Sequence, residues 1–182
     1  MCAFWTRGIF KEPYFLQNNI KYYWRLDTDS RILAQIKYDI FEFIKRRKVV
    51  YAFRSRQWEA SWMVNGLSMF IHNYAKKNKI ELWNLPVLKE LTNSTSSLDQ
   101  YYTNFEMVYI PAFRDDPEVS SWLEDVWLSG GNYRYRWGDG PLRYYTVHLF
   151  PKLYKKLHHF CDIKYSHQMF SFEPTCNHSM GS

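Results

Sequence analysis

KYYWRLDTD, residues 21–29, is the stretch that decides the fold. Its aromatic part, residues 21–26, suits a β-strand, and the strand stops at an acidic turn over residues 27–30. In α/β proteins ligands bind at such strand ends. The carboxylates of Asp27 and Asp29 therefore predict a divalent-cation site that would neutralise a nucleotide diphosphate. The alternative is a turn whose side chains bond their own backbone.

Strand and helix patterns alternate after this stretch. Asp39 followed by Glu42 resembles a capping box, and the short helix that it begins ends in the basic cluster 45–48. Residues 49–53 are typical of the next strand. Apolar residues then recur at helical spacing across residues 62–78, which predicts an amphipathic helix.

The same alternation continues toward the C-terminus. Residues 116–118, Asp-Pro-Glu, predict a helix start, and the glycines at 130–131 predict its end. We expect a strand over residues 133–137. Residues 138–141, Gly-Asp-Gly-Pro, then open a helix that Pro151 terminates.

These patterns predict one domain of α/β class. The chain has 182 residues, enough to bury a core without disulfides or a structural metal. The polar stretch 93–97 is too short to link two domains, and a last apolar segment near Phe160 and Ile163 precedes a polar tail. Alternating strands and helices imply an α/β sandwich with a largely parallel or mixed sheet.

Composition limits the function classes. Aromatic residues make up 20% of the chain, which indicates a thick core or platforms for sugars and bases. The net charge of +6 would attract an anionic partner. However, the densest basic clusters, 45–48 and 152–156, lie near predicted helix ends, where cations are favoured by the helix dipole. We therefore expect no nucleic-acid partner.

The cysteines and the hydropathy give few signals. Cys2, Cys161 and Cys176 cannot all pair with one another, and none has the close spacing of a zinc or redox motif. No apolar stretch approaches the roughly 18 residues of a membrane span, and the N-terminus lacks the regions of a signal peptide. We expect a soluble chain without a membrane segment.

Four further residues could carry chemistry. Glu106 lies among aromatic residues, and a carboxylate beside an anomeric carbon can stabilise an oxocarbenium ion or attack it. Asp139 could accept hydroxyls of a sugar that stacks on Trp137, or it could cap the following helix. His167 could bind a metal, although a lone histidine is more often structural.

Five segments, taken in order, resemble one known family. They are residues 1–4 (MCAF), 22–29 (YYWRLDTD), 103–106 (TNFE), 136–141 (RWGDGP) and 158–167 (HHFCDIKYSH). Together they are similar to glycosyltransferase family 15, the fungal alpha-1,2-mannosyltransferases of N- and O-glycan extension. The resemblance extends from Met1 to about residue 174.

The resemblance implies a fold and an activity. The fold is a partial glycosyltransferase A-type fold of α/β class, with a mixed sheet flanked by helices. Residues 1–174 would be the C-terminal part of the catalytic domain, and residues 175–182 a polar tail. The activity is retaining transfer of mannose from GDP-mannose to an alpha-mannosyl acceptor on a glycoprotein or oligosaccharide, with Mn²⁺, in the Golgi lumen. The family's N-terminal half, with its membrane anchor, would precede Met1.

The resemblance also assigns residues to roles. Asp27 and His167 take the places of metal ligands, with Asp29 able to help, because Asp27 stands where the family has Glu and its arm is shorter by about 1.5 Å. Glu106 falls on the candidate nucleophile. The segments around both sugars contribute Arg25, Trp137 and Asp139. Retention is compatible with a covalent intermediate or with a same-face displacement.

Two other functions remain open. Departures such as Ala3 for Arg, Tyr135 for Glu and Cys161 for Asp each remove a charge near the implied site. The chain could therefore be a truncated or divergent enzyme, or a non-catalytic carbohydrate-binding or regulatory remnant. The third hypothesis is a basic nucleic-acid-binding domain, whose binding would weaken steeply with added salt.

Overall fold

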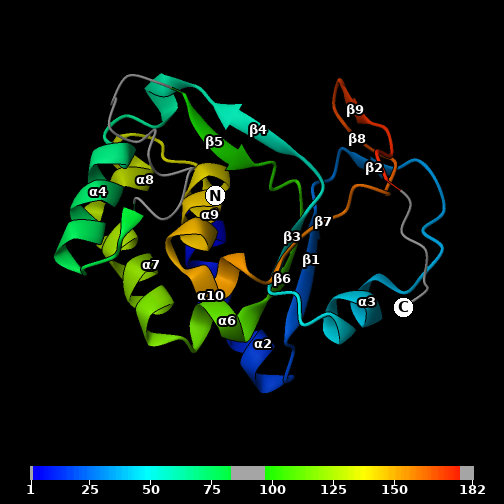
Figure 1. Ribbon diagram of the computed structural model, residues 1–182, viewed down its shortest axis with the longest axis horizontal. Helices are drawn as coiled ribbons and strands as arrows, with labels where there is room; N and C mark the ends of the chain where they lie inside the picture. The colour runs from blue at the N-terminus through cyan, green and yellow to red at the C-terminus, as the bar shows by residue number, and fades with distance from the viewer. Residues whose placement is uncertain (1, 83–96, 177–182) are drawn as a thin grey trace.

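The centre of the molecule is a four-stranded mixed sheet. The computed structural model describes residues 2–82 and 97–176, so most of the predicted polar loop at 93–97 lies outside the described residues. The strands run in the order β1 (Tyr22–Leu26), β6 (Phe105–Tyr109), β3 (Tyr51–Phe53) and β7 (Leu157–His159), as Figure 1 shows. Only the β3–β7 pair is parallel, and this confirms the predicted mixed sheet.

Two small sheets extend the fold beyond the central one. A three-stranded sheet joins β2 (Ser30–Ile32), β8 (Tyr165–His167) and β9 (Phe170–Phe172). A two-stranded sheet pairs β4 (Arg56–Glu59) with β5 (Leu98–Tyr101). Within the described residues no helix is long and apolar enough to cross a membrane.

Helices cover both faces of the central sheet, and Figure 1 shows most of them on one side and α3 on the other. The helices and helical turns are α1 (Cys2–Thr6), η1 (Gly8–Lys11), α2 (Pro13–Gln17), α3 (Ile40–Arg46), η2 (Ser61–Met63), α4 (Leu67–Lys77), α6 (Ile110–Arg114), α7 (Pro117–Ser129), α8 (Gly131–Arg134), α9 (Asp139–Leu149) and α10 (Pro151–Tyr154).

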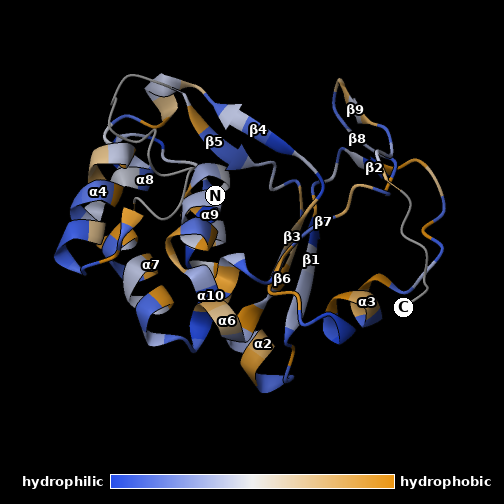
Figure 2. Cartoon of the chain, in the orientation of Figure 1, coloured by the Kyte–Doolittle hydropathy of each residue, from blue (hydrophilic) through white to orange (hydrophobic). Residues whose placement is uncertain are grey.

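Strand alternation divides the interior into two cores. On β6, Phe105 and Met107 face the smaller core, which contains the inner side of α3. Val108 and Glu106 point the other way, because successive strand residues face opposite sides. The larger core lies on that side, around α9, all 11 of whose residues are buried. Figure 2 shows the strongly hydrophobic residues gathered in the central strands and on inner helix faces.

Local signals explain the elements that were predicted correctly. The Asp116 carboxylate accepts hydrogen bonds from the amides of Glu118 and Val119, both at 3.1 Å, and so begins α7. Gly130 ends that helix with φ of 69°, a left-handed conformation that glycine adopts without strain. Asp39 caps α3 in the same way.

The predicted strand over residues 133–137 was wrong. Residues Gly131–Arg134 form the short helix α8 instead, and the chain then turns back so that Trp137 is only 3% exposed. The Trp137 indole donates to the Asn65 carbonyl at 2.7 Å, and Asn132 donates to the Trp137 carbonyl at 2.7 Å. The aromatic residues of this segment therefore serve packing, and no neighbouring strand pairs with it among the described residues.

A disulfide that the cysteine spacing did not reveal closes the C-terminal region. Cys161 and Cys176 are bonded, with 5.5 Å between their Cα atoms. The loop between them carries β8 and β9. Arg54, which is buried, donates to the carbonyls of Ile163 and Glu173 at 2.5 and 2.7 Å, so the base of this hairpin is fastened to the central sheet.

Gly131 gives a stability test of the Trp137 packing. A Cβ at Gly131 would come within 2.1 Å of the Trp137 ring, which cannot move without leaving the core. We expect Gly131→Ala to lower the free energy of unfolding by about 1–3 kcal/mol in urea titrations. Gly138→Ala is the control: its Cβ would lie 3.5 Å from Pro141, an ordinary contact, so we expect a loss below about 1 kcal/mol. Equal losses would show that Trp137 does not restrict position 131.

Candidate active site

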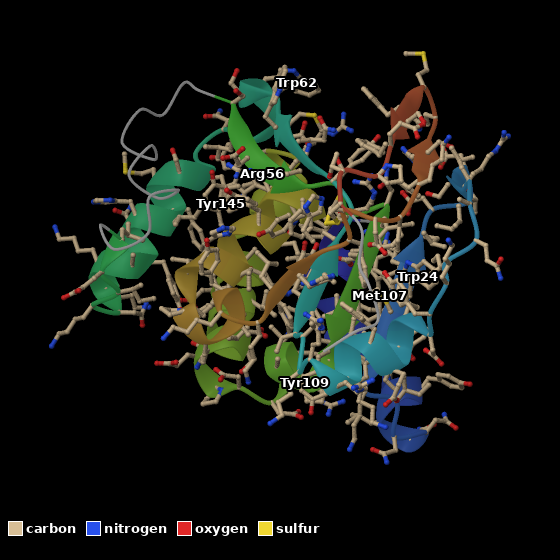
Figure 3. The ribbon with its side chains drawn as sticks, turned by 45° about the vertical axis from the view of Figure 1, so that its right-hand side comes forward. Trp24, Arg56, Trp62, Met107, Tyr109 and Tyr145 are labelled. Atoms are coloured by element: carbon tan, nitrogen blue, oxygen red, sulfur yellow. A yellow bond between two sulfur atoms is a disulfide. The ribbon has the colours of Figure 1, made fainter. Side chains whose placement is uncertain are left out.

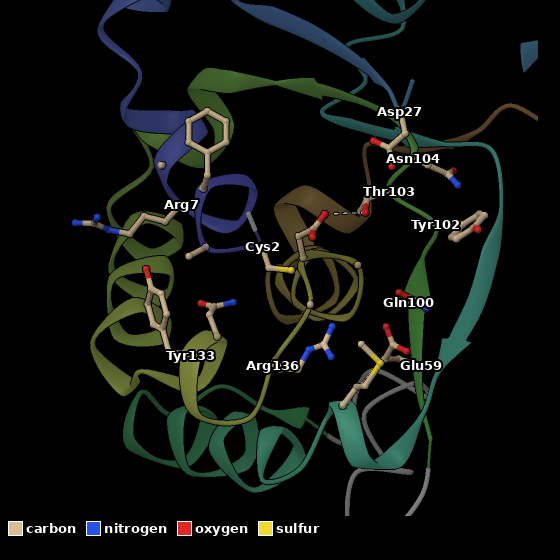
Figure 4. Close-up of a pocket in the computed structure, with 18 of the residues that line it drawn as sticks. Cys2, Arg7, Asp27, Glu59, Gln100, Tyr102, Thr103, Asn104, Tyr133 and Arg136 are labelled. Atoms are coloured by element: carbon tan, nitrogen blue, oxygen red, sulfur yellow. Dashed lines mark hydrogen bonds between the residues drawn. The ribbon is translucent and has the colours of Figure 1, made fainter. Parts of the chain in front are cut away.

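A cavity of about 770 Å³ opens where the central sheet, α1 and the start of α9 meet, and Figure 4 shows its wall. This volume lies in the range of small-molecule sites. Its wall includes three of the predicted site residues, Asp27, Asp139 and His167. Asp27 and His167, far apart in sequence, thus reach the same cavity.

Arg25 joins two of the acidic residues of this wall. Its guanidinium donates to Asp139 at 2.6 Å and to Asp27 at 3.0 Å, and it lies over the Trp5 ring at 4.2 Å. Asp139 also accepts from the hydroxyl of Thr103 at 2.8 Å. Burial works to lower the pKa of the Arg25 guanidinium, but Asp139 raises it above its ordinary value, so the charge is retained.

Asp139 does not cap α9, which was the alternative interpretation of this residue. The capping position is Gly138, and it makes no side-chain capping bond. Asp139 is instead the first residue of the helix, where its carboxylate turns to Arg25 and Thr103. A negative charge there is also favoured by the helix dipole.

Glu106 lies beneath the cavity wall, and it is not among the residues that line the cavity. Its side chain is fully buried, and it accepts hydrogen bonds from the hydroxyls of Tyr23 at 2.8 Å and Tyr51 at 3.1 Å. Arg143 of α9 donates at 3.1 Å to the same carboxylate oxygen as Tyr51, while Tyr23 donates to the other oxygen. Glu106 therefore lies among aromatic residues, as the sequence indicated, but protein groups occupy all of the space around its carboxylate.

The carboxylates and guanidiniums form one buried cluster. Arg25 lies opposite Glu106 in the register of β1 and β6, while Arg143 of α9 forms an ion pair with Glu106. Burial works to lower the pKa of Arg143, but Glu106 raises it well above its ordinary value. Burial, with Glu106 next, raises the pKa of Tyr23. The negative charges of Glu106 and Asp139 thus neutralise the positive charges of Arg143 and Arg25, which have little contact with water.

Asp29 and His167 form the second charged feature. The imidazole Nε2 lies 2.9 Å from Asp29, and Nδ1 lies 2.8 Å from the hydroxyl of Tyr102. Asp29 also accepts from Gln168 at 3.0 Å, and this bond is the largest influence that lowers the pKa of the exposed Asp29 carboxyl. The pairing of Ser30 with His167 in β2 and β8 brings the two residues together.

These residues offer a partial metal site. Carboxylate oxygens suit manganese, and imidazole is the commonest metal ligand, so Asp29 and His167 are a fitting pair. Asp27 uses one oxygen for Arg25. Within residues 2–82 and 97–176, no group of three or more His, Cys, Asp or Glu side chains is arranged so that it could hold a metal ion.

Trp137 lies in the core and does not line the cavity, so the structure does not bring it to the other site residues. Three residues that the sequence analysis did not single out belong to the arrangement: Tyr102, Thr103 and Arg143. Thr103 is the first residue of the segment TNFE and Tyr102 directly precedes it, so both could have been noted for that reason. Arg143 gave no signal, because an arginine inside a helical pattern normally points to solvent.

Glu106→Gln tests the buried cluster. Removing this charge leaves Arg143, which is 2% exposed, without its buried counter-ion. We expect the free energy of unfolding to fall by about 3–5 kcal/mol in urea titrations, and Arg143→Met in the same chain to restore part of the loss. Glu42→Gln is the control, since its pair with Lys45 is exposed and 3.8 Å long, and it should cost below about 0.5 kcal/mol. A Glu106 loss as small as that of Glu42 would contradict the cluster.

The fold is similar to two solved fungal structures. One is the mannosyltransferase Ktr4p from Saccharomyces cerevisiae in complex with GDP, with a TM-score of 0.82 and 26% identity over 97% of this chain and 47% of that one. The other is core-mannan synthase A from Aspergillus fumigatus in a Mn/GDP form, with a TM-score of 0.81 and 23% identity over 98% of this chain and 51% of that one. The second likeness shows the fold alone.

The sequence is also similar to curated fungal proteins. The probable mannosyltransferase KTR4 of Saccharomyces cerevisiae is 28% identical over 97% of this chain, and MNT3 of Candida albicans, also a probable mannosyltransferase, is 30% identical over 92%. The chain spans 39% and 43% of their lengths. The model of the family described as glycolipid 2-alpha-mannosyltransferase matches residues 1–179. The chain therefore belongs to the glycolipid 2-alpha-mannosyltransferase family.

Proposed function

We propose that this chain carries the acceptor and catalytic side of a retaining alpha-1,2-mannosyltransferase that uses GDP-mannose. One observation carries the proposal: Asp139 and the contacting pair Asp29 and His167, which we propose to hold a cation, lie at the same cavity. Asp139 and His167 line that cavity, and His167 holds Asp29 at 2.9 Å. A sugar site and a diphosphate site must adjoin in such an enzyme, because the bond that breaks joins the sugar to the diphosphate.

Asp29 and His167 are the residues that we propose to hold Mn²⁺, with Asp27 beside them. The cation would supply positive charge to the leaving diphosphate. Core-mannan synthase A from Aspergillus fumigatus, which shares the fold, was solved in a Mn/GDP form. The Tyr102 hydroxyl contacts the other ring nitrogen of His167 at 2.8 Å and fixes the ring orientation.

Asp139 and Thr103 are the residues that we propose to bind the transferred mannose. Sugar hydroxyls need acceptors and donors in fixed positions, and Arg25 holds the Asp139 carboxylate from behind. The charge of Asp139 is also suited to an oxocarbenium-like transition state, since it is negative and shielded from water. Trp137 supports this wall only indirectly, through the fold of the segment that leads to Asp139.

Glu106 reaches a sugar only if its contacts with Tyr23, Tyr51 and Arg143 rearrange, because no part of its side chain is exposed. We propose that it acts first as the buried charge that holds Arg25 and Arg143 in place. Its role as nucleophile in a covalent mechanism is the alternative to a same-face displacement. Its burial favours, as a second candidate function, a chain that binds mannosides without turnover.

The Cys161–Cys176 disulfide supports a location in the secretory pathway. Disulfides form and persist in oxidising compartments, and they are rare in the cytosol. Together with the fungal mannosyltransferases among the relatives, this favours the Golgi lumen as the place of action. The proposed acceptor is a mannosylated glycoprotein or oligosaccharide of that pathway.

A transfer assay tests the proposal. Incubated with GDP-mannose, methyl alpha-mannoside and Mn²⁺, the protein should form an alpha-linked disaccharide, detected by the anomeric proton signal, and EDTA should stop it. His167→Ala should lower the rate about 10- to 100-fold, because a metal-holding group is lost. The control His72→Ala changes an exposed histidine of α4 and should have no effect. Binding of the mannoside without transfer would favour the second candidate, and neither binding nor transfer would reject both.

A further inference from the structure

The cavity is longer than the proposed transfer site. Figure 4 shows Asp27, Thr103 and Tyr102 at one end of the cavity and Glu59 and Arg136 at the other. The residues proposed to hold the cation and the transferred mannose belong to the first end. The second end is therefore left for another part of a ligand.

Arg136 is a free cation at this second end. Among residues 2–82 and 97–176 it forms no ion pair, although it lines the cavity and is exposed. Its φ of 59° is unusual for a residue other than glycine and costs on the order of 1 kcal/mol. The next residue, Trp137, is buried, whereas Arg136 is exposed. This conformation leaves the Arg136 guanidinium, with its planar set of donors, directed to the cavity.

Trp62 supplies a flat apolar surface next to this guanidinium. The Arg136 guanidinium lies 5.9 Å from the centroid of the Trp62 ring, and the tryptophan is 65% exposed. Figure 3 shows Trp62 at the outside of the fold. Met63, its neighbour in η2, and Glu59, at the end of β4, line the cavity at the same end. Trp62 itself does not line the cavity, so the indole lies beside the cavity, next to the Arg136 guanidinium, while Arg136 and Glu59 belong to the cavity wall.

This combination suits a neutral polyol. The apolar face of a sugar can pack on the indole, while its hydroxyls accept hydrogen bonds from Arg136 and donate to Glu59. An anion such as phosphate would be attracted by Arg136 but repelled by Glu59, because both side chains line this end of the cavity. The mixed charge therefore favours a sugar over an anion.

We propose that Glu59, Trp62, Met63 and Arg136 form a subsite for the second sugar of the acceptor glycan. This is the sugar adjacent to the one that receives the mannose. The inference rests on the proposed function, since it assumes that the receiving sugar lies between Asp139 and this end. It makes the chain prefer an acceptor of at least two sugars over a single mannoside.

The test compares alpha-1,2-mannobiose with methyl alpha-mannoside, both titrated by calorimetry in the presence of Mn²⁺ and GDP. Trp62→Ala should weaken binding of mannobiose about fivefold or more and leave methyl mannoside unchanged. Arg136→Ala should act in the same direction. The control is Trp58→Ala: Trp58 is 69% exposed, but it lies on the opposite face of β4 from Glu59, so its loss should change neither titration.

Three outcomes would overturn the subsite. If Trp62→Ala weakened the binding of both ligands equally, or weakened the binding of neither, Trp62 would not contact the second sugar. Competition by inorganic phosphate that disappears in Arg136→Ala would show an anion site. Failure of the unaltered protein to bind either sugar would reject the proposed function as well, whereas normal binding of methyl mannoside confines the failure to the subsite.

Discussion

The structure depends on the neutralisation of two buried guanidiniums. Arg25 and Arg143 approach the same region from β1 and from α9, and both are almost fully shielded from water. A lone charge in such a place would cost several kcal/mol, so each needs a partner. Asp139 and Glu106 meet this need, and together they fix α9 against the sheet.

This constraint shapes the cavity. The Arg25–Asp139 bond of 2.6 Å sets the position of the first turn of α9 relative to β1. The Asp139 carboxylate is therefore held at the cavity wall before any ligand arrives, which is the preorganisation that electrostatic catalysis requires. At the other side, the disulfide and Arg54 fasten the hairpin that carries His167. A binding arrangement thus rests on rigid elements on both sides.

Local patterns predicted the elements, and tertiary contacts decided the rest. The helix after Asp116 was predictable, because its cap, its apolar stripe and its final glycine are all encoded within the segment. The segment 133–137 has the aromatic content of a strand, but packing on Gly131 determines its fold. The resemblance assigned the metal to Asp27 and His167, with Asp29 able to help, whereas the direct contact of His167 in the structure is with Asp29. The sequestration of Glu106 was not, because its partner Arg143 is 37 positions away.

The central claim is that one cavity joins a cation site to a mannose site. Crystals soaked with Mn²⁺ and GDP-mannose, measured near the manganese absorption edge, test it most directly. The account predicts an anomalous peak within coordination distance of Asp29 and His167, with sugar density against Asp139 in the same cavity. A manganese peak bound elsewhere, or sugar density outside the cavity while Asp29 and His167 remain paired with each other, would contradict it.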